Sequence, residues 1–169
     1  EETEKATKMY DETAERVEKA ERIIIVGGGA TGTEQACEIA TKYPEKDVTL
    51  ISARDMLISD RTNEAFQRKL NSILARLKIK VIKGEKIVGL ADIDDSKVAP
   101  IIVTTDKGTE LQADLVMKCI GLWVNNQVYK DSVSESMDDK GYLKVNQYLQ
   151  VEGQNNIYAI GDCINLEDK

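Results

Sequence analysis

The sequence predicts an α/β protein with a Rossmann-like parallel sheet, an antiparallel β-meander and a fragment of a second domain. A β-branched run, Arg22–Val26, stops at three glycines and gives way to a segment with helical character. The segment Asp47–Ser52 has the character of a second strand, so strand, glycine turn, helix and strand form one βαβ unit. Beyond Lys86, short extended runs alternate with turn residues, which is typical of a meander.

Two helices are predicted around this unit from apolar spacing and helix breakers. A lead-in helix over residues 1–20 is indicated by apolar side chains that recur every three or four positions among charges. They are Ala6, Tyr10, Ala14, Val17 and Ala20. The helix that begins at the glycines should end at Tyr43, because Pro44 cannot continue it.

A third helix and a third parallel strand should follow. Asp60 is a suitable helix cap, and the apolar residues after it keep helical spacing. They are Phe66, Leu70, Ile73, Leu74 and Leu77. Lys78 then introduces a strand around Val81, and the lysines near it are interpreted as the solvated side of that strand rather than as an anion site. They are Lys78, Lys80, Lys83 and Lys86.

The meander is expected to contain three short strands, Ile87–Leu90, Ile101–Thr105 and Leu111–Ala113. The tripeptide Asp106-Lys107-Gly108 has hairpin-turn chemistry and lies between the last two. These strands should therefore pair in an antiparallel manner.

A domain boundary is predicted after one more apolar strand, Leu115–Ile120. Residues 124–140 are polar, charged and irregular. We therefore assign residues 21–123 to the Rossmann domain and residues 124–169 to a linker and part of a second domain. Two extended segments are expected in that part. They are Tyr142–Val151 and Ile157–Ile160.

Composition excludes several classes of function. With 169 residues and a net charge of -7, the chain lacks the basic surface that nucleic acid requires. It has no histidine, so histidine acid/base chemistry is excluded and a zinc site would need carboxylates alone. Three widely spaced cysteines form neither a disulfide framework nor a CxxC pair, which favours a reducing compartment. No apolar run encodes membrane attachment, and the missing initiator Met suggests a piece of a longer protein.

The glycine turn is the strongest functional motif. Gly27, Gly29 and Gly32 have GxGxxG spacing directly between a strand and a helix. In such a turn the first glycine allows a sharp bend, the second lets a pyrophosphate approach the backbone, and the third lets the helix lie close to the strand. The remaining residues of the turn, Gly28, Ala30 and Thr31, are included in the predicted dinucleotide site. The helix dipole would hold the anion there, and Thr31 could add a hydroxyl donor.

The end of the second strand bears on cofactor choice. A dinucleotide site of this type usually has a carboxylate there for the ribose 2′-hydroxyl, but this chain has Ser52. Arg54 follows closely and could bind a 2′-phosphate, or it could be a solvated side chain. Use of both NADH and NADPH is therefore open.

Three stretches together resemble the apoptosis-inducing-factor-like flavoproteins, with type II NADH dehydrogenases further away. They are VGGGATGTEQACEIATKYPEKDVTLIS, TDKGTELQADLVMKCIG and LKVNQYLQVEGQNNIYAIGDC. In such proteins a nicotinamide domain is inserted into an FAD domain, so the resemblance implies that Gly27, Gly29 and Gly32 serve NAD(P)H. It also implies a cytoplasmic or mitochondrion-associated location.

The resemblance implies roles for further residues. Glu34 matches a position near the nicotinamide ribose, although a first-turn carboxylate stabilised by the helix dipole is the alternative. Ile87 matches a residue that packs on adenine, and Ile120 with Gly121 matches a strand end beside the nicotinamide. Asp162 matches the aspartate that binds the ribityl chain of FAD in the full-length protein.

The implied function is hydride transfer from NAD(P)H to FAD, and then electron transfer to a quinone-like acceptor. The first FAD-binding glycine turn is absent from this chain. We therefore expect the chain alone to bind flavin poorly and to be inactive. Two alternatives remain: a nucleotide-sensing binding module without catalysis, and a glycine turn that binds FAD itself.

Overall fold

The computed structural model describes residues 2–121 and 124–166, which fall into two compact units. The first unit is Glu1–Gly121 and the second is Leu122–Lys169. The helix α1 (Glu2–Lys19) is therefore grouped with the first unit rather than standing apart from it. Residues 122–123, where we predicted the end of the Rossmann domain, lie outside the described residues.

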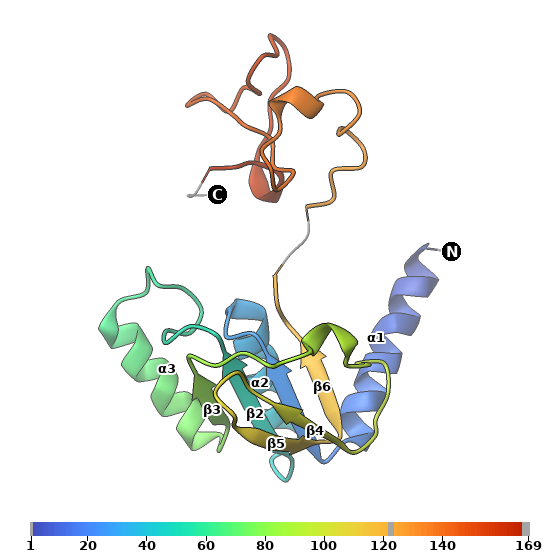
Figure 1. The fold of residues 1–169 in the computed structure, drawn as a ribbon, viewed down its shortest axis with the longest axis vertical. Helices are drawn as coiled ribbons and strands as arrows, with labels where there is room; N and C mark the ends of the chain where they lie inside the picture. Colours follow the sequence, from blue (N-terminus) through green and yellow to red (C-terminus); the bar gives the residue numbers. More distant parts are fainter. Residues whose placement is uncertain (1, 122–123, 167–169) are drawn as a thin grey trace. The chain divides into compact units, whose positions relative to one another are not determined.

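The first unit is built on a parallel sheet with the order β3-β2-β1-β6 (Figure 1). Its strands are β1 (Arg22–Val26), β2 (Asp47–Ser52), β3 (Lys80–Lys83) and β6 (Leu115–Lys118). Each pairs in parallel with its neighbours. The chain runs outward from β1 to β3 and then returns to the other side of β1, which confirms the predicted Rossmann-like sheet.

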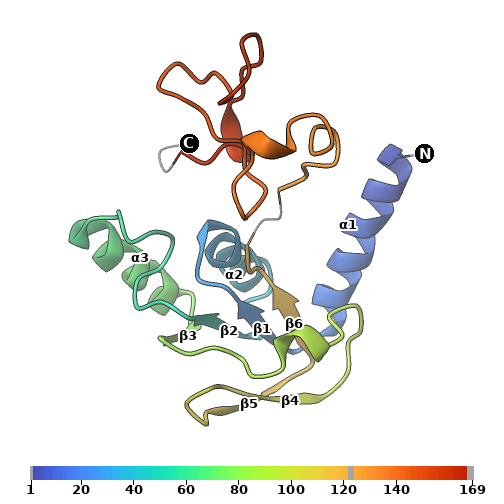
Figure 2. The same ribbon diagram turned by 45° about the horizontal axis from the view of Figure 1, so that its top comes forward.

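Helices cover one face of this sheet and a β-hairpin covers the other (Figure 2). The helices α1, α2 (Ala30–Lys42) and α3 (Glu64–Arg76) contribute Val17, Ile39 and Leu74 to a cluster with Ile23 and Leu50. On the other face, β4 (Ile101–Thr104) and β5 (Glu110–Ala113) pack on alternate residues of the same strands. Both faces of the central strands are therefore buried, as their β-branched composition predicts.

The predicted cap of α3 is wrong. The helix begins at Glu64, and its cap is Asn63, whose side chain accepts a hydrogen bond from the Phe66 amide at 2.9 Å. Asp60 lies earlier, in the loop after β2. Asn63 takes the role because its extended backbone places the side-chain oxygen over the first turn.

The predicted meander is reduced to a two-stranded hairpin. β4 and β5 pair in an antiparallel manner around the turn at residues 106–108. The predicted strand Ile87–Leu90 is wrong, because only Ile87 makes a bridge, to Thr105. Gly89 has a positive φ and leads into the 3-10 turn Leu90–Asp92, which ends the extended conformation.

The second unit has little regular structure. Its described residues, 124–166, form isolated bridges and two 3-10 turns around a small apolar cluster. The predicted extended segment Tyr142–Val151 is wrong, because the chain folds back on itself and Val145 pairs with Val151. Leu149, with a φ of 64°, makes that reversal possible.

Candidate functional site

A pocket of about 420 Å³ lies at the carboxyl ends of the parallel strands. Ligands of open α/β sheets bind at this edge, where the strand order reverses, and the volume lies within the range of small-molecule sites. The pocket is lined by the glycine turn and by the loops after β2, β3 and β6. Every one of these residues belongs to the first unit.

The pocket brings together most of the residues that the sequence predicted. They are Gly27, Gly28, Gly29, Ser52, Arg54, Ile87, Ile120 and Gly121. Ala30, Thr31, Gly32 and Glu34 follow the turn on α2 and are not among its lining residues. The separate chain segments converge because parallel strands direct their carboxyl ends to one edge.

Gly27 and Gly32 are required by the packing of the protein itself. Gly27 has a φ of 124°, and a Cβ there would collide with the Cys119 carbonyl. A Cβ on Gly32 would collide with the Gly27 carbonyl oxygen. These two glycines therefore allow α2 and β6 to approach the turn closely, in agreement with the packing role predicted for the third glycine.

Gly29 differs, because nothing in the protein requires a glycine there. Its φ is -72°, which any residue adopts, and a Cβ would have no atom of the protein within 4 Å. Gly29 also lines the pocket. The space that a side chain would fill is thus left open at the site, where a ligand could contact the backbone.

The turn also presents unsatisfied donors. Gly29 is the N-cap of α2, has no side-chain cap, and its carbonyl accepts the first helical bond from the Thr33 amide at 3.0 Å. The amides of Ala30, Thr31 and Gly32 precede that bond and have no acceptor within the helix. Together with the helix dipole, these amides favour an anion.

Ser52, at the end of β2, packs against the glycine turn. It is only 2 % exposed, and its hydroxyl donates to the Arg54 carbonyl at 2.9 Å and accepts from the Arg54 amide at 3.2 Å. A Cβ on Gly28 would lie 2.5 Å from the Ser52 Cβ, so these two small residues fit against each other. Ser52 therefore holds the backbone of Arg54 in place. It occupies the position at the end of β2 where dinucleotide sites of this type usually have a carboxylate.

Arg54 is neither buried nor simply solvated. Its side chain is 49 % exposed and lines the pocket, while its Nη2 donates to the Ile58 carbonyl at 3.2 Å. Its Nη1 lies 3.7 Å from Asp60 Oδ2. The guanidinium is thus held at the rim by its own loop.

Several pocket residues were not predicted as part of the site. Lys86, interpreted above as a solvated strand lysine, lines the pocket with Glu85 and Leu90. Its position directly before Ile87, in a loop after a parallel strand, was the available signal. Cys119 also lines the pocket, and burial raises the pKa of its thiol, which keeps it neutral.

The side chains of Thr31, Glu34 and Asp162 are not among those that line the pocket. Thr31 lines a second groove, between α1 and α2, together with Tyr10 and Ile39. Glu34 is exposed, and its interpretation as a first-turn carboxylate is wrong because α2 begins at Ala30 and has no acidic residue in its first turn. Asp162 is exposed on the 3-10 turn Gly161–Cys163 of the second unit.

Comparison with known proteins identifies related sequences and structures. The model of the pyridine nucleotide-disulphide oxidoreductase family matches residues 2–168. Ferroptosis suppressor protein 1 of Taeniopygia guttata is 36% identical over 98% of this chain and 44% of its own length. Apoptosis-inducing factor homolog B of Dictyostelium discoideum is 30% identical over 94% of this chain and 45% of its own. The chain therefore spans less than half the length of these relatives, and the resemblance predicted above is confirmed.

A solved structure shares the fold. An FAD-dependent pyridine nucleotide-disulphide oxidoreductase from Desulfovibrio vulgaris has a TM-score of 0.66 and 31% identity, over 86% of this chain and 35% of its own. Among the described residues, no helix has the length and apolar character needed to cross a membrane.

Proposed function

From the premise that this chain belongs to the pyridine nucleotide-disulphide oxidoreductase family, we propose that it is the NAD(P)H-binding part of a flavoprotein oxidoreductase. The pocket at the glycine turn is its nicotinamide dinucleotide site. The observation that carries this proposal is Gly29, which the fold does not require and which leaves open space beside the first amides of α2. A diphosphate fits this space and these donors.

The rest of the pocket accommodates the two ends of the cofactor. We place adenosine between the loops after β2 and β3, where Ser52, Arg54 and the buried Ile87 lie. The nicotinamide end extends to Ile120 and Gly121 after β6. Because Ser52 replaces the usual carboxylate and Arg54 stands at the rim, the site accepts both NADH and NADPH.

In the full-length protein, bound FAD supplies the acceptor for the hydride of the reduced nicotinamide, and a quinone-like compound is the final electron acceptor. Asp162 would accept hydrogen bonds from the flavin ribityl chain. Asp162 is the one residue of this chain to which we assign a flavin contact, so we expect these 169 residues by themselves to bind nicotinamide dinucleotides without turnover.

Calorimetric titration of the 169-residue chain with NADH, NADPH and FAD tests the proposal. We expect saturable binding of both nicotinamide dinucleotides and weak or no binding of FAD. Failure to bind either nicotinamide cofactor would refute the site, and preferential binding of FAD would reassign the glycine turn. In parallel, a full-length protein without flavin and without NAD(P)H oxidation would refute the enzyme assignment.

A further inference from the structure

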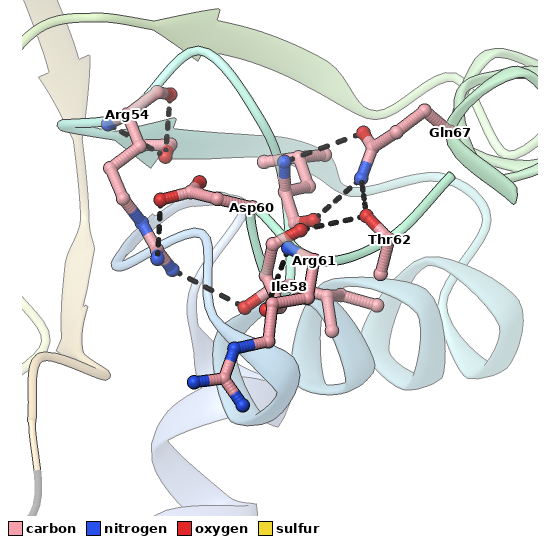
Figure 3. A network of polar contacts seen from close by, with 9 residues as sticks. Arg54, Ile58, Asp60, Arg61, Thr62 and Gln67 are labelled. Carbon is pink, nitrogen blue, oxygen red and sulfur yellow. Dashed lines mark hydrogen bonds and ion pairs between the residues drawn. The ribbon is translucent and has the colours of Figure 1, made fainter. Parts of the chain in front are cut away.

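The loop after β2 holds Arg54 with two of its own groups (Figure 3). The guanidinium donates through Nη2 to the Ile58 carbonyl at 3.2 Å and pairs through Nη1 with Asp60 at 3.7 Å. Each of the two Nη atoms therefore already has one partner within the protein. These are the groups that would form a bidentate contact with a phosphate.

Hydrogen bonds with the glycine turn and with α3 hold this loop in place. They therefore also fix the positions of the groups that contact Arg54. The Ile58 amide donates to the Gly28 carbonyl at 2.7 Å, which ties the loop to the glycine turn. The Gln67 side chain donates to the Leu57 carbonyl at 2.8 Å and to the Thr62 hydroxyl at 2.6 Å. Leu57 is fully buried.

Ile58 is also held in an unusual conformation. Its φ of 67° is rare for a β-branched residue and persists only where the surroundings determine it. That conformation lets one residue donate to the glycine turn and accept from Arg54. Ile58 thus links the guanidinium of Arg54 to Gly28, which lines the pocket.

The contact with Asp60 is weak enough to exchange. The side chain of Asp60 is 66% exposed and that of Arg54 is 49% exposed, and such ion pairs are screened by solvent. A 2′-phosphate carries more negative charge than a carboxylate at neutral pH and offers three acceptor oxygens. A bound phosphate can therefore displace Asp60 from Arg54, at the cost of breaking the pair.

We propose that Asp60 is a positioning residue that sets the preference between NADH and NADPH, by competing with the 2′-phosphate for Arg54. This inference rests on the proposed function of the pocket. Asp60 acts through Arg54, so it lowers the affinity for NADPH and leaves the affinity for NADH unchanged.

The test is the ratio of NADPH to NADH dissociation constants, measured by calorimetry at low ionic strength for the 169-residue chain and its Asp60→Asn variant. We expect NADPH to bind about two- to five-fold more tightly to the variant, with NADH unchanged, as for an exposed ion pair. A general disturbance of the loop would move both constants together. Glu64→Gln is the matched control. It also removes one negative charge close to Asp60 in the sequence, but the Glu64 carboxylate accepts a hydrogen bond from Arg68 at 3.2 Å rather than pairing with Arg54.

The variants Arg54→Ala and Arg54→Ala with Asp60→Asn complete the test. Arg54→Ala should weaken NADPH more than NADH, and adding Asp60→Asn to it should then have no further effect on NADPH. A gain that persists without Arg54 would overturn the inference, because Asp60 would then repel the phosphate directly. An unchanged ratio of the NADPH and NADH dissociation constants in Asp60→Asn would also overturn the inference. If NADH still binds in that case, the proposed function of the pocket stands. If the unaltered chain binds neither cofactor, the proposed function fails and the inference fails with it.

Discussion

The two compact units differ in how far their own residues account for their structure. In the first unit, apolar clusters cover both faces of a parallel sheet. The second unit buries a small cluster that includes Leu143 and Val151. The first unit therefore has a fold that is specified by apolar layers on both faces of its sheet, whereas the described part of the second unit relies on a small cluster and has little regular structure.

This difference decides where function can be inferred from packing. In the first unit, a residue that the core does not require, such as Gly29, or that is held under strain, such as Ile58, indicates another constraint, and the pocket supplies one. In the second unit, the candidate Asp162 is supported by its sequence motif alone. We therefore expect substitutions in the first unit to affect folding or cofactor binding, and substitutions at the flavin motif to affect neither in this chain.

The largest effect should come from Gly32→Ala. The new Cβ would collide with the Gly27 carbonyl, which belongs to the backbone of the turn and cannot yield easily. We expect the free energy of unfolding to fall by about 3 kcal/mol, as for a severely overpacked site. Urea denaturation measures this. Gly29→Ala is the control and should cost no more than about 1 kcal/mol, whereas equal losses for the two variants would contradict the distinction between these glycines.

Gly29→Val should separate binding from folding. The side chain would enter the open space of the pocket and keep a diphosphate from the amides of α2. Loss of two charge-assisted hydrogen bonds predicts a decrease in NADH affinity of about 100-fold. Far-ultraviolet circular dichroism should remain unchanged. Unaltered NADH affinity in a folded variant would place the cofactor somewhere else.

The acid stability of the first unit should depend on Asp114. Its carboxylate accepts from Arg22 Nη2 at 2.6 Å and from the Arg22 amide at 2.8 Å, which joins the starts of β1 and β6. The side-chain hydrogen bond from Arg22 lowers the pKa of Asp114 in the folded state. The stabilisation is therefore complete above the unfolded pKa of about 3.9 and is lost as the pH falls through the lower folded value.

Urea denaturation of the unaltered chain and Asp114→Asn between pH 3 and pH 7 measures this contribution. We expect the variant to be less stable near neutral pH, and the difference between the two proteins to shrink below about pH 4. A difference that stays constant across this range would show that the charge of Asp114 has no part in the stabilisation.

The smallest effect is expected from Asp162→Ala. This residue is exposed on a turn of the second unit, whereas the pocket proposed for the nicotinamide dinucleotide is lined by residues of the first unit. NADH affinity and urea stability should both be unchanged. A loss of NADH affinity comparable to that of Gly29→Val would show that the second unit contributes to the site, and the contrast between the units would fail.

Sequence patterns predicted the first unit well because its signals are local and agree with one another. The run Arg22–Val26, the glycines and the run Asp47–Ser52 each indicate the same βαβ unit. The errors arose where a single residue decides the structure. Gly89 ends the extended conformation before a third meander strand can form, and Asn63 caps α3 in place of Asp60.

The candidate site was predicted only in part, because its rim depends on loop geometry. The glycine spacing identified the turn, but Lys86 enters the pocket through the loop after β3. Arg54 donates a hydrogen bond to the carbonyl of Ile58, whose positive φ is rare for a β-branched residue and is not indicated by the sequence. In the second unit, the extended pattern of residues 142–151 gave no sign of the reversal at Leu149.

Nuclear magnetic resonance titration of the ¹⁵N-labelled chain with NADH provides the most direct test of anion binding at the start of α2. The largest amide shifts should occur at residues 28–32, with smaller shifts at residues 52–54 and 86–87 along the adenosine side of the pocket. Shifts concentrated in the groove between α1 and α2, or in the second unit, with the glycine turn unaffected, would contradict the proposed binding of the cofactor diphosphate by these backbone amides.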